Sequence, residues 1–244
     1  MGFFQGSFYS EALKRNTHLS VYKPIGFRAE SKVIVFLHGI ADNDHSWITL
    51  TSACRLAEQT NTALVFADCN RSFYINTYYG ARYHDYINQE LPKAIHFFFN
   101  LPNEKERLYI AGNSMGGYGA LRAYLQPNSC YGAVIAFSPV TNLRQCYDQL
   151  LPPDLSLPNE PEGLFGPCLI DAPENDLFDL LKQKAEEDLN ITIYCGAEDF
   201  LKVGIDAFHR HMEDNNVKHK YVVDAGEHNW SYWDRAVVHL FNQF

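Results

Sequence analysis

This sequence of 244 residues lacks several features that are typical of membrane proteins, nucleic-acid-binding proteins and secreted proteins. No stretch approaches the ~18 uninterrupted apolar residues of a transmembrane helix, so we expect no membrane span. Lys and Arg form no run and the net charge is −9, which argues against a nucleic-acid partner. The first ten residues lack the basic start and apolar core of a signal peptide. We therefore predict a cytoplasmic protein, with a secreted form without its leader as the alternative.

The six cysteines are scattered, and no Cys-x-x-Cys pair occurs. This distribution is typical of small apolar side chains in a reducing compartment rather than of a disulfide framework. His209 and His211 are the pair that most resembles a metal motif. Residues two apart on a helix point to different faces, so we predict no metal site.

Short apolar runs alternate with longer amphipathic stretches along the chain. The runs are rich in Val, Ile and Phe and predict buried strands, whereas the stretches between them predict helices. This alternation predicts one α/β domain, residues 1–244, with a mostly parallel sheet and helices on both faces. The predicted strands are 32–38, 62–67, 107–111, 133–137, 191–195 and 218–223, and the predicted helices are 46–58, 83–99, 115–126, 203–215 and 231–242.

Three segments depart from this alternation. Pro92 lies inside the second predicted helix and should kink or divide it. The opening segment Ser7–Tyr22 predicts an antiparallel hairpin at the edge of the sheet. Segment 141–187 is rich in proline and acidic residues and has no strong strand pattern. Because it lies between two predicted strands, we interpret it as an insertion that either packs on the surface or covers a pocket.

The segment Gly112–Gly116 reads Gly-Asn-Ser-Met-Gly, directly after a predicted strand and directly before a predicted helix. This is the context of a nucleophile elbow, in which a strained turn lifts the serine hydroxyl above the sheet. The following helix aims its first N–H groups at the place where negative charge develops in acyl transfer. Ser114 is therefore the predicted nucleophile.

A serine hydrolase needs two backbone N–H donors for the tetrahedral oxyanion. Met115, the residue after the predicted nucleophile, supplies the first. The sequence Phe-Leu-His-Gly-Ile closes the first buried strand, and we predict Ile40 as the second donor, with Gly39 permitting the turn. His38 precedes the serine in the chain, so we predict that it holds this loop rather than acting as the base.

The acid and the base are expected after later strands. The strand 191–195 leads into Glu198 and Asp199, and we prefer Asp199 as the carboxylate, with Asp206 as a weaker alternative. His228 lies in the loop between the last strand and the last helix, where this fold places its general base. The order Ser114, Asp199, His228 is the order expected of an α/β hydrolase.

Taken together, these positions resemble the esterase D-like α/β hydrolases, particularly the tributyrin or acetyl esterase branch. Segments 44–47, 72–74, 78–80, 90–92 and 228–233 match as well, so the resemblance covers nearly the whole chain. It implies an α/β-hydrolase fold, carboxylesterase activity on short acyl chains, no cofactor and the triad just described. The sequence resembles S-formylglutathione hydrolases and feruloyl or acetyl-xylan esterases more distantly.

The predicted function is hydrolysis of acetyl or butyryl esters through an acyl-enzyme, with a small-molecule ester as partner. Trp47 and Trp230 are candidates for lining the substrate pocket, and a homo-oligomer is possible. A thioesterase of the S-formylglutathione type and a carbohydrate acetyl or feruloyl esterase are alternatives on the same fold. A third interpretation is a non-catalytic binding module on a hydrolase scaffold. The sequence argues against it, because it retains the serine, the acid, the base and the oxyanion loop.

Overall fold

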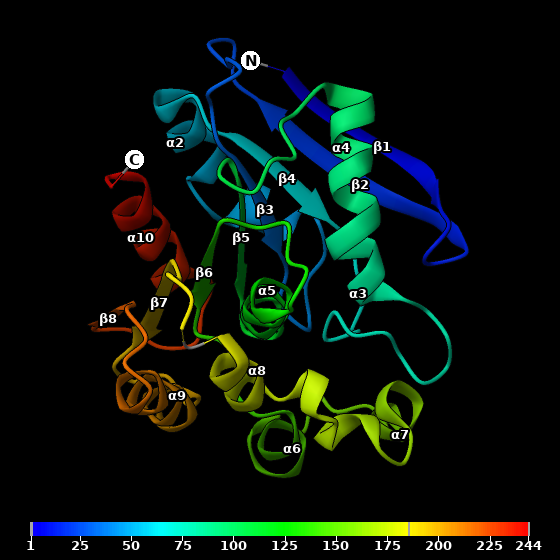
Figure 1. Ribbon diagram of the computed structural model, residues 1–244, viewed down its shortest axis with the longest axis vertical. Helices are drawn as coiled ribbons and strands as arrows, with labels where there is room; N and C mark the ends of the chain where they lie inside the picture. Colours follow the sequence, from blue (N-terminus) through cyan, green and yellow to red (C-terminus); the bar gives the residue numbers. More distant parts are fainter. Residues whose placement is uncertain (1, 185, 244) are drawn as a thin grey trace.

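The computed structural model describes residues 2–184 and 186–243, and over these residues eight strands form one sheet (Figure 1). The strand order is β1-β2-β4-β3-β5-β6-β7-β8. β2 pairs antiparallel with β1 and β4, and the pairs from β4 to β8 are parallel, as the sequence predicts. The strands are β1 (Gly2–Ser10), β2 (Arg15–Lys23), β3 (Val33–Leu37), β4 (Ala63–Ala67), β5 (Leu108–Asn113), β6 (Ala133–Phe137), β7 (Ile191–Gly196) and β8 (Lys220–Asp224).

Helices cover both faces of this sheet (Figure 1). The α-helices are α1 (Ser46–Leu50), α2 (Ala53–Thr60), α3 (Tyr83–Asp85), α4 (Leu91–Phe99), α5 (Met115–Leu125), α6 (Leu143–Gln145), α7 (Glu160–Phe165), α8 (Leu177–Lys184), α9 (Lys202–Asp214) and α10 (Trp230–Phe241). Two π-helical turns, η1 (Tyr86–Glu90) and η2 (Cys146–Leu150), and two 3₁₀ turns, η3 (Leu169–Asp171) and η4 (Pro173–Asn175), complete the helical segments.

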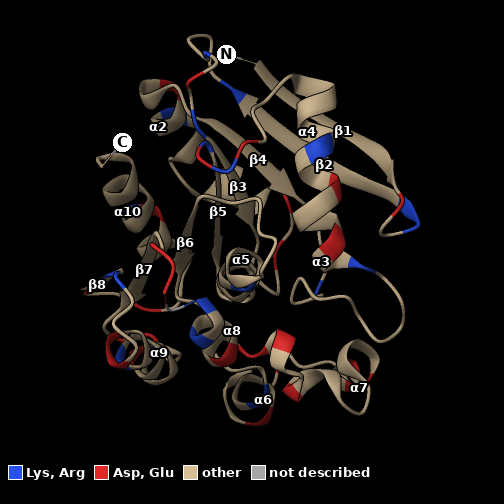
Figure 2. Ribbon diagram, in the orientation of Figure 1, with Lys and Arg blue, Asp and Glu red and all other residues tan. Residues whose placement is uncertain are grey.

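The alternation of side chains along β3 shows how the two layers form. Val33 and Val35 belong to the core cluster that also contains apolar residues of α4, α5, α8 and α9. Ile34 and Phe36 belong to the cluster that contains residues of α2 and α10. Because successive side chains of a strand point to opposite faces, an uninterrupted apolar strand is buried on both sides. Figure 2 shows that β3, β4, β5 and β6 carry no charged residue.

Two predicted helices are interrupted. The predicted helix 46–58 is divided into α1 and α2, because the hydroxyl of Thr51 donates to the Trp47 carbonyl and the amide of Ser52 donates to Asp234. In the predicted helix 83–99, the π-helical turn η1 comes directly before α4, whose second residue is Pro92. The predicted division at Pro92 is therefore seen as a change of helical pitch one turn earlier.

The insertion between β6 and β7 contains α6, η2, α7, η3, η4 and α8, and no strand among its described residues. In Figure 1 its helices lie below α5, and α8 is the one that lies next to α5 and α9. α8 contacts both α5 and α9, so the insertion packs against the body of the fold. Across the part of the chain that is described, none of the helices is long and apolar enough to traverse a bilayer.

Candidate active site

Ser114 lies in the tight turn between β5 and α5. Its backbone has φ 54° and ψ −116°, a conformation that a residue with a side chain adopts only under strain. The Ser114 amide donates to the Phe137 carbonyl at 2.9 Å, and the Ser114 carbonyl accepts from the Val140 amide at 3.1 Å. The end of β6 therefore holds the turn in its strained form.

The glycines on either side of this turn are required by close backbone packing. A Cβ atom on Gly112 would collide with the carbonyl oxygen of Gly116, and one on Gly116 would collide with the carbonyl oxygen of Leu37. The first turn of α5 consequently lies directly against the end of β3. This approach brings Met115, the first residue of α5, beside the loop that follows β3.

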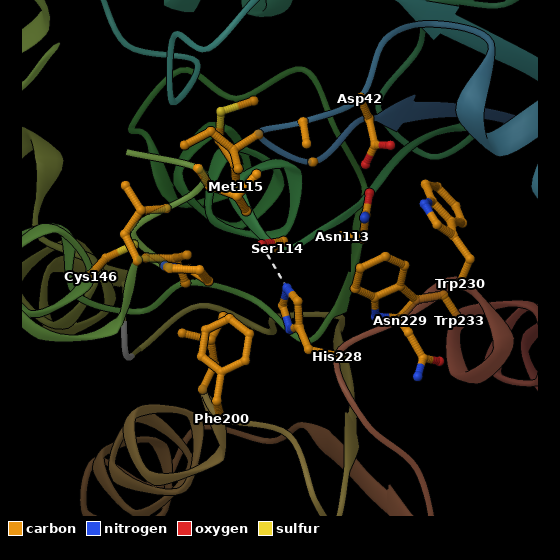
Figure 3. A pocket seen from close by; sticks show the side chains of 18 of the residues that line it. Asp42, Asn113, Ser114, Met115, Cys146, Phe200, His228, Asn229, Trp230 and Trp233 are labelled. Carbon is orange, nitrogen blue, oxygen red and sulfur yellow. Dashed lines mark hydrogen bonds between the residues drawn. The ribbon is translucent and has the colours of Figure 1, made fainter. Parts of the chain in front are cut away.

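The side chains of Ser114, His228 and Asp199 form one hydrogen-bonded chain, and Figure 3 shows its contact between Ser114 and His228. Nε2 of His228 lies 2.9 Å from Oγ of Ser114, and Nδ1 lies 3.0 Å and 3.1 Å from the two carboxylate oxygens of Asp199. Asp199 follows β7, and His228 lies in the loop between β8 and α10. Three elements far apart in the sequence thus meet at the carboxyl edge of the parallel strands.

The Asp199 carboxylate is buried, and its side chain has no exposed surface. Burial acts to raise its pKa, but hydrogen bonds from His228, Ser138 and the Leu201 amide outweigh burial and hold the pKa below its usual value. Asp199 is therefore ionised at neutral pH. Glu198 points elsewhere, because its carboxylate accepts from the Gly226 amide at 2.6 Å and so braces the loop that carries His228.

His38 holds the loop after β3 through both ring nitrogens. The Cys69 amide donates to Nε2 at 3.1 Å, so Nε2 carries no hydrogen and Nδ1–H donates to the Gly39 carbonyl at 2.8 Å. Gly39 O and the N–H of Ile40 belong to the same planar trans peptide and point in opposite directions. The imidazole therefore fixes the direction of the Ile40 N–H, as predicted for a loop-holding residue.

The carbonyl groups next to Gly39 are also bound by side chains. The Trp47 indole donates to the Leu37 carbonyl at 3.0 Å, and the Tyr74 hydroxyl donates to the His38 carbonyl at 2.9 Å. Trp47 is only 1% exposed and packs behind Trp230, with ring centroids 5.0 Å apart. It does not line the cavity next to Ser114. This differs from the prediction, because an indole that anchors the β3 loop is turned away from the substrate space.

A cavity of about 350 Å³ opens above Ser114. The predicted residues Ile40, Met115, His228 and Trp230 line it together with Ser114. Most of its wall is apolar, and the insertion contributes four of its lining residues: Cys146, Leu151, Pro152 and Leu155. Of the two readings of the insertion, the structure thus supports the one in which it forms part of a pocket.

Sequence reasoning missed two aromatic residues that contact the imidazole of His228. The ring of Phe200 lies 4.5 Å from it and that of Trp233 lies 5.0 Å away in an edge-on arrangement, both as centroid distances (Figure 3). Phe200 directly follows the predicted acid Asp199, and Trp233 lies close after the predicted base His228. These positions in the sequence could have suggested that both rings lie near the site. They could not show that the rings contact the imidazole, because that contact depends on tertiary packing.

Comparisons with known proteins extend over nearly the whole chain. The profile of the family described as "Putative esterase" matches residues 10–243. An acetyl esterase from Caldicellulosiruptor saccharolyticus is 27% identical over 264 residues, which cover 99% of this chain and 97% of that protein.

Two solved structures from Staphylococcus aureus are similar in fold. FphF, a fluorophosphonate-binding serine hydrolase with substrate bound, has a TM-score of 0.89 and 26% identity, with 99% of this chain and 97% of that chain covered. The apoenzyme of the S-formylglutathione hydrolase FrmB has a TM-score of 0.84 and 25% identity, with 99% and 98% covered.

Proposed function

We propose that this chain, which belongs to the esterase family and is a serine hydrolase of the α/β-hydrolase fold, hydrolyses short-chain acyl esters with Ser114 as its nucleophile. The observation that carries this proposal is the hydrogen-bonded chain from Ser114 Oγ through the imidazole of His228 to Asp199. A serine hydroxyl is a weak nucleophile until a base accepts its proton, and this arrangement provides that base.

The reaction proceeds through an acyl-enzyme. Ser114 Oγ attacks the ester carbonyl carbon while its proton passes to Nε2 of His228, and Asp199 stabilises the resulting imidazolium. The amides of Ile40 and Met115 donate to the oxyanion. The imidazolium then protonates the leaving alcohol as the carbon–oxygen bond breaks. A water molecule then attacks the acyl carbon while His228 takes its proton, and the imidazolium returns that proton to Ser114 Oγ as the acyl–oxygen bond breaks and the acid leaves.

The cavity supports a short acyl chain as the substrate group. Its volume of about 350 Å³ is at the small end for ligand pockets, and its wall is mostly apolar. The similarity to an acetyl esterase along the whole chain supports the same size class. Trp230, on the wall opposite the insertion residues, is proposed to contact the substrate (Figure 3).

The same site supports a second candidate reaction, hydrolysis of an S-acyl thioester of the S-formylglutathione type. The whole-chain similarity to FrmB at 25% identity favours this alternative over a carbohydrate ester. The chemistry is unchanged, with a thiolate in place of the leaving alkoxide. We further propose that the enzyme works in the cytoplasm as a single α/β domain, since the six cysteines are free thiols.

The test is a substrate panel. The specificity constant kcat/KM is measured for p-nitrophenyl acetate, butyrate, hexanoate and decanoate, and for S-formylglutathione and acetylated or feruloylated sugars. The proposal expects a maximum at acetate or butyrate, and a decrease of about 10⁵-fold or more in kcat for Ser114→Ala. Ser156→Ala, which removes an exposed serine of the insertion, is the control and should retain wild-type rates. A maximum at decanoate, or an active Ser114→Ala protein, would overturn it.

A further inference from the structure

The side chain of Arg71, which follows β4, contacts both the loop that carries Ile40 and the insertion. Its guanidinium contacts three partners. Nε and Nη2 bind the two carboxylate oxygens of Glu160 at 2.5 Å and 2.8 Å, and Nη2 also donates to the Leu155 carbonyl at 2.6 Å. Nη1 lies 3.4 Å from the Ile40 carbonyl, a longer contact.

The three partners of Arg71 belong to different parts of the site. Leu155 lines the cavity from the insertion, and Ile40 lines it from the loop after β3. Glu160 begins α7, and its carboxylate also accepts from the Tyr147 hydroxyl at 3.3 Å. The Glu160 side chain is 8% exposed and the Arg71 side chain 25%, so this partly buried ion pair is less screened by salt than a surface pair. A planar guanidinium can hold two oxygens and a carbonyl at fixed angles, which an ammonium group cannot do.

The residues that follow Arg71 bind the same loop. Phe73 and Tyr74 have φ values of 47° and 56°, two successive left-handed residues that carry side chains. Such a strained segment persists only where its surroundings hold it. Here Phe73 lines the cavity, and the Tyr74 hydroxyl donates to the His38 carbonyl. Segment 71–74 therefore contacts the loop after β3, the cavity and the insertion at once.

From these contacts we infer that Arg71 is a positioning residue that couples the insertion wall of the acyl pocket to the oxyanion loop, so that the acyl group of the substrate influences the rate of attack. This inference rests on the proposed esterase function. An acyl chain that packs against Leu155 holds the insertion side of the pocket in one conformation. The planar guanidinium of Arg71, which binds the Leu155 carbonyl, in turn holds the backbone of Ile40 in place. The binding energy of the chain is then used in the transition state as well as in the bound substrate.

The test compares the kcat and KM of wild type and Arg71→Gln on p-nitrophenyl acetate, butyrate and hexanoate, per active site titrated with a fluorophosphonate. Arg71→Gln should lower kcat by roughly 10- to 100-fold, since small errors in the position of an oxyanion donor are costly. It should also change the butyrate-to-acetate ratio of kcat/KM by at least about threefold. Arg71→Lys, which keeps the charge without the planar fork, should not restore either quantity.

Arg144→Gln is the matched control. Arg144 belongs to the insertion and, like Arg71, pairs with a carboxylate, that of Asp171, but its side chain is 52% exposed and does not line the cavity. Its variant should keep the wild-type kcat and chain-length ratio. Loss of folding alone would lower the titrated fraction of active sites without changing the chain-length ratio.

Glu160→Gln keeps the size of the side chain and removes only the charge. If Arg71→Gln yields no folded protein, this variant tests the coupling between the insertion and the oxyanion loop instead. It should change the chain-length ratio in the same direction by a smaller factor, and its effect should not add to that of Arg71→Gln. An active wild-type esterase whose Arg71→Gln or Glu160→Gln variant keeps both kcat and the ratio would overturn the coupling alone. A wild-type protein without activity on any ester would instead overturn the proposed function.

Discussion

Nδ1 of His228 faces both carboxylate oxygens of Asp199 at nearly equal distances, 3.0 Å and 3.1 Å. An acceptor on that side fixes the proton on Nδ1 and leaves the lone pair of Nε2 directed at Ser114. Asp199→Asn keeps the shape but offers an N–H donor, which favours the wrong tautomer. We expect kcat for p-nitrophenyl acetate to fall by roughly 10³- to 10⁴-fold at pH 7.

Measuring kcat for a variant of Glu198 as well distinguishes the role of Asp199 from that of its neighbour. Glu198→Gln, next in the chain, should lower kcat by less than about tenfold, because Glu198 contacts the Gly226 amide and not the imidazole. Equal losses for the two variants would show that Asp199 is not the residue that orients His228.

A second prediction concerns His38, whose Nδ1–H holds the Gly39 carbonyl. His38→Leu removes this donor, so the Ile40 N–H loses its fixed direction and kcat should fall by roughly 10- to 100-fold. His38→Asn places an amide nitrogen near the position of Nδ1 and should recover part of the rate. KM should change little in either variant, since the acyl wall is untouched. Equal kcat values for the Leu and Asn variants would count against this role.

A third prediction concerns the insertion side chains that line the cavity, which we expect to limit the length of the acyl chain. Leu151→Ala removes apolar wall without touching the oxyanion loop, so the preferred acyl chain should lengthen by about two carbons. Leu157→Ala serves as the control, because Leu157 belongs to the same insertion but is 50% exposed and lies outside the cavity lining. The measurement is kcat/KM over p-nitrophenyl esters of two to eight carbons. An unchanged profile for Leu151→Ala would contradict the assignment of this wall.

Acid should destabilise the fold through His84. Burial, and then the adjacent Arg122 guanidinium, lower the pKa of His84 to about 4, and Arg122 donates to its Nδ1 at 2.7 Å. An unfolded histidine titrates near ~6.5, so between that pH and about 4 the unfolded chain binds a proton that the folded chain does not. The free energy of unfolding therefore falls as pH is lowered through this window.

The corresponding measurement is urea unfolding at pH 7 and pH 5. His84→Gln keeps an acceptor for Arg122 but does not titrate. Between these two pH values the wild type should lose up to about 2 kcal/mol more than the variant. Parallel losses in the two proteins would show that His84 is not the group responsible.

Local patterns in the sequence predict the fold, and they also predict the residues that the structure brings together at the centre of the candidate site. The turn at Ser114 is flanked by an apolar strand and a periodic helix, both of which are local signals. Asp199 and His228 follow strands, and the topology of a parallel sheet brings strand ends to one edge. The division of the helix 46–58 was not predictable in this way, because the Ser52 amide is bound by Asp234, 182 residues later.

The residues that line the cavity were harder to predict from the sequence than the triad, because their positions depend on tertiary structure. Leu151 and Leu155 lie in a segment without periodicity, and only folding shows that they face Ser114. Trp47 is a residue that the sequence wrongly predicts to line the pocket. Whether an indole faces a substrate or anchors a carbonyl is decided by the packing of α1 against the sheet, which the sequence pattern does not reveal.

The central claim, that Ser114 is the nucleophile, is tested most directly by locating a covalent adduct. The protein is treated with a fluorophosphonate and examined by intact mass and by peptide mapping, while the remaining esterase activity is followed. We expect one phosphonyl group per chain on the peptide that contains Ser114, activity lost in proportion to labelling, and no adduct on Ser114→Ala. Esterase activity that persists after complete labelling of Ser114, or a label on another residue that abolishes activity while Ser114 is unmodified, would contradict the account.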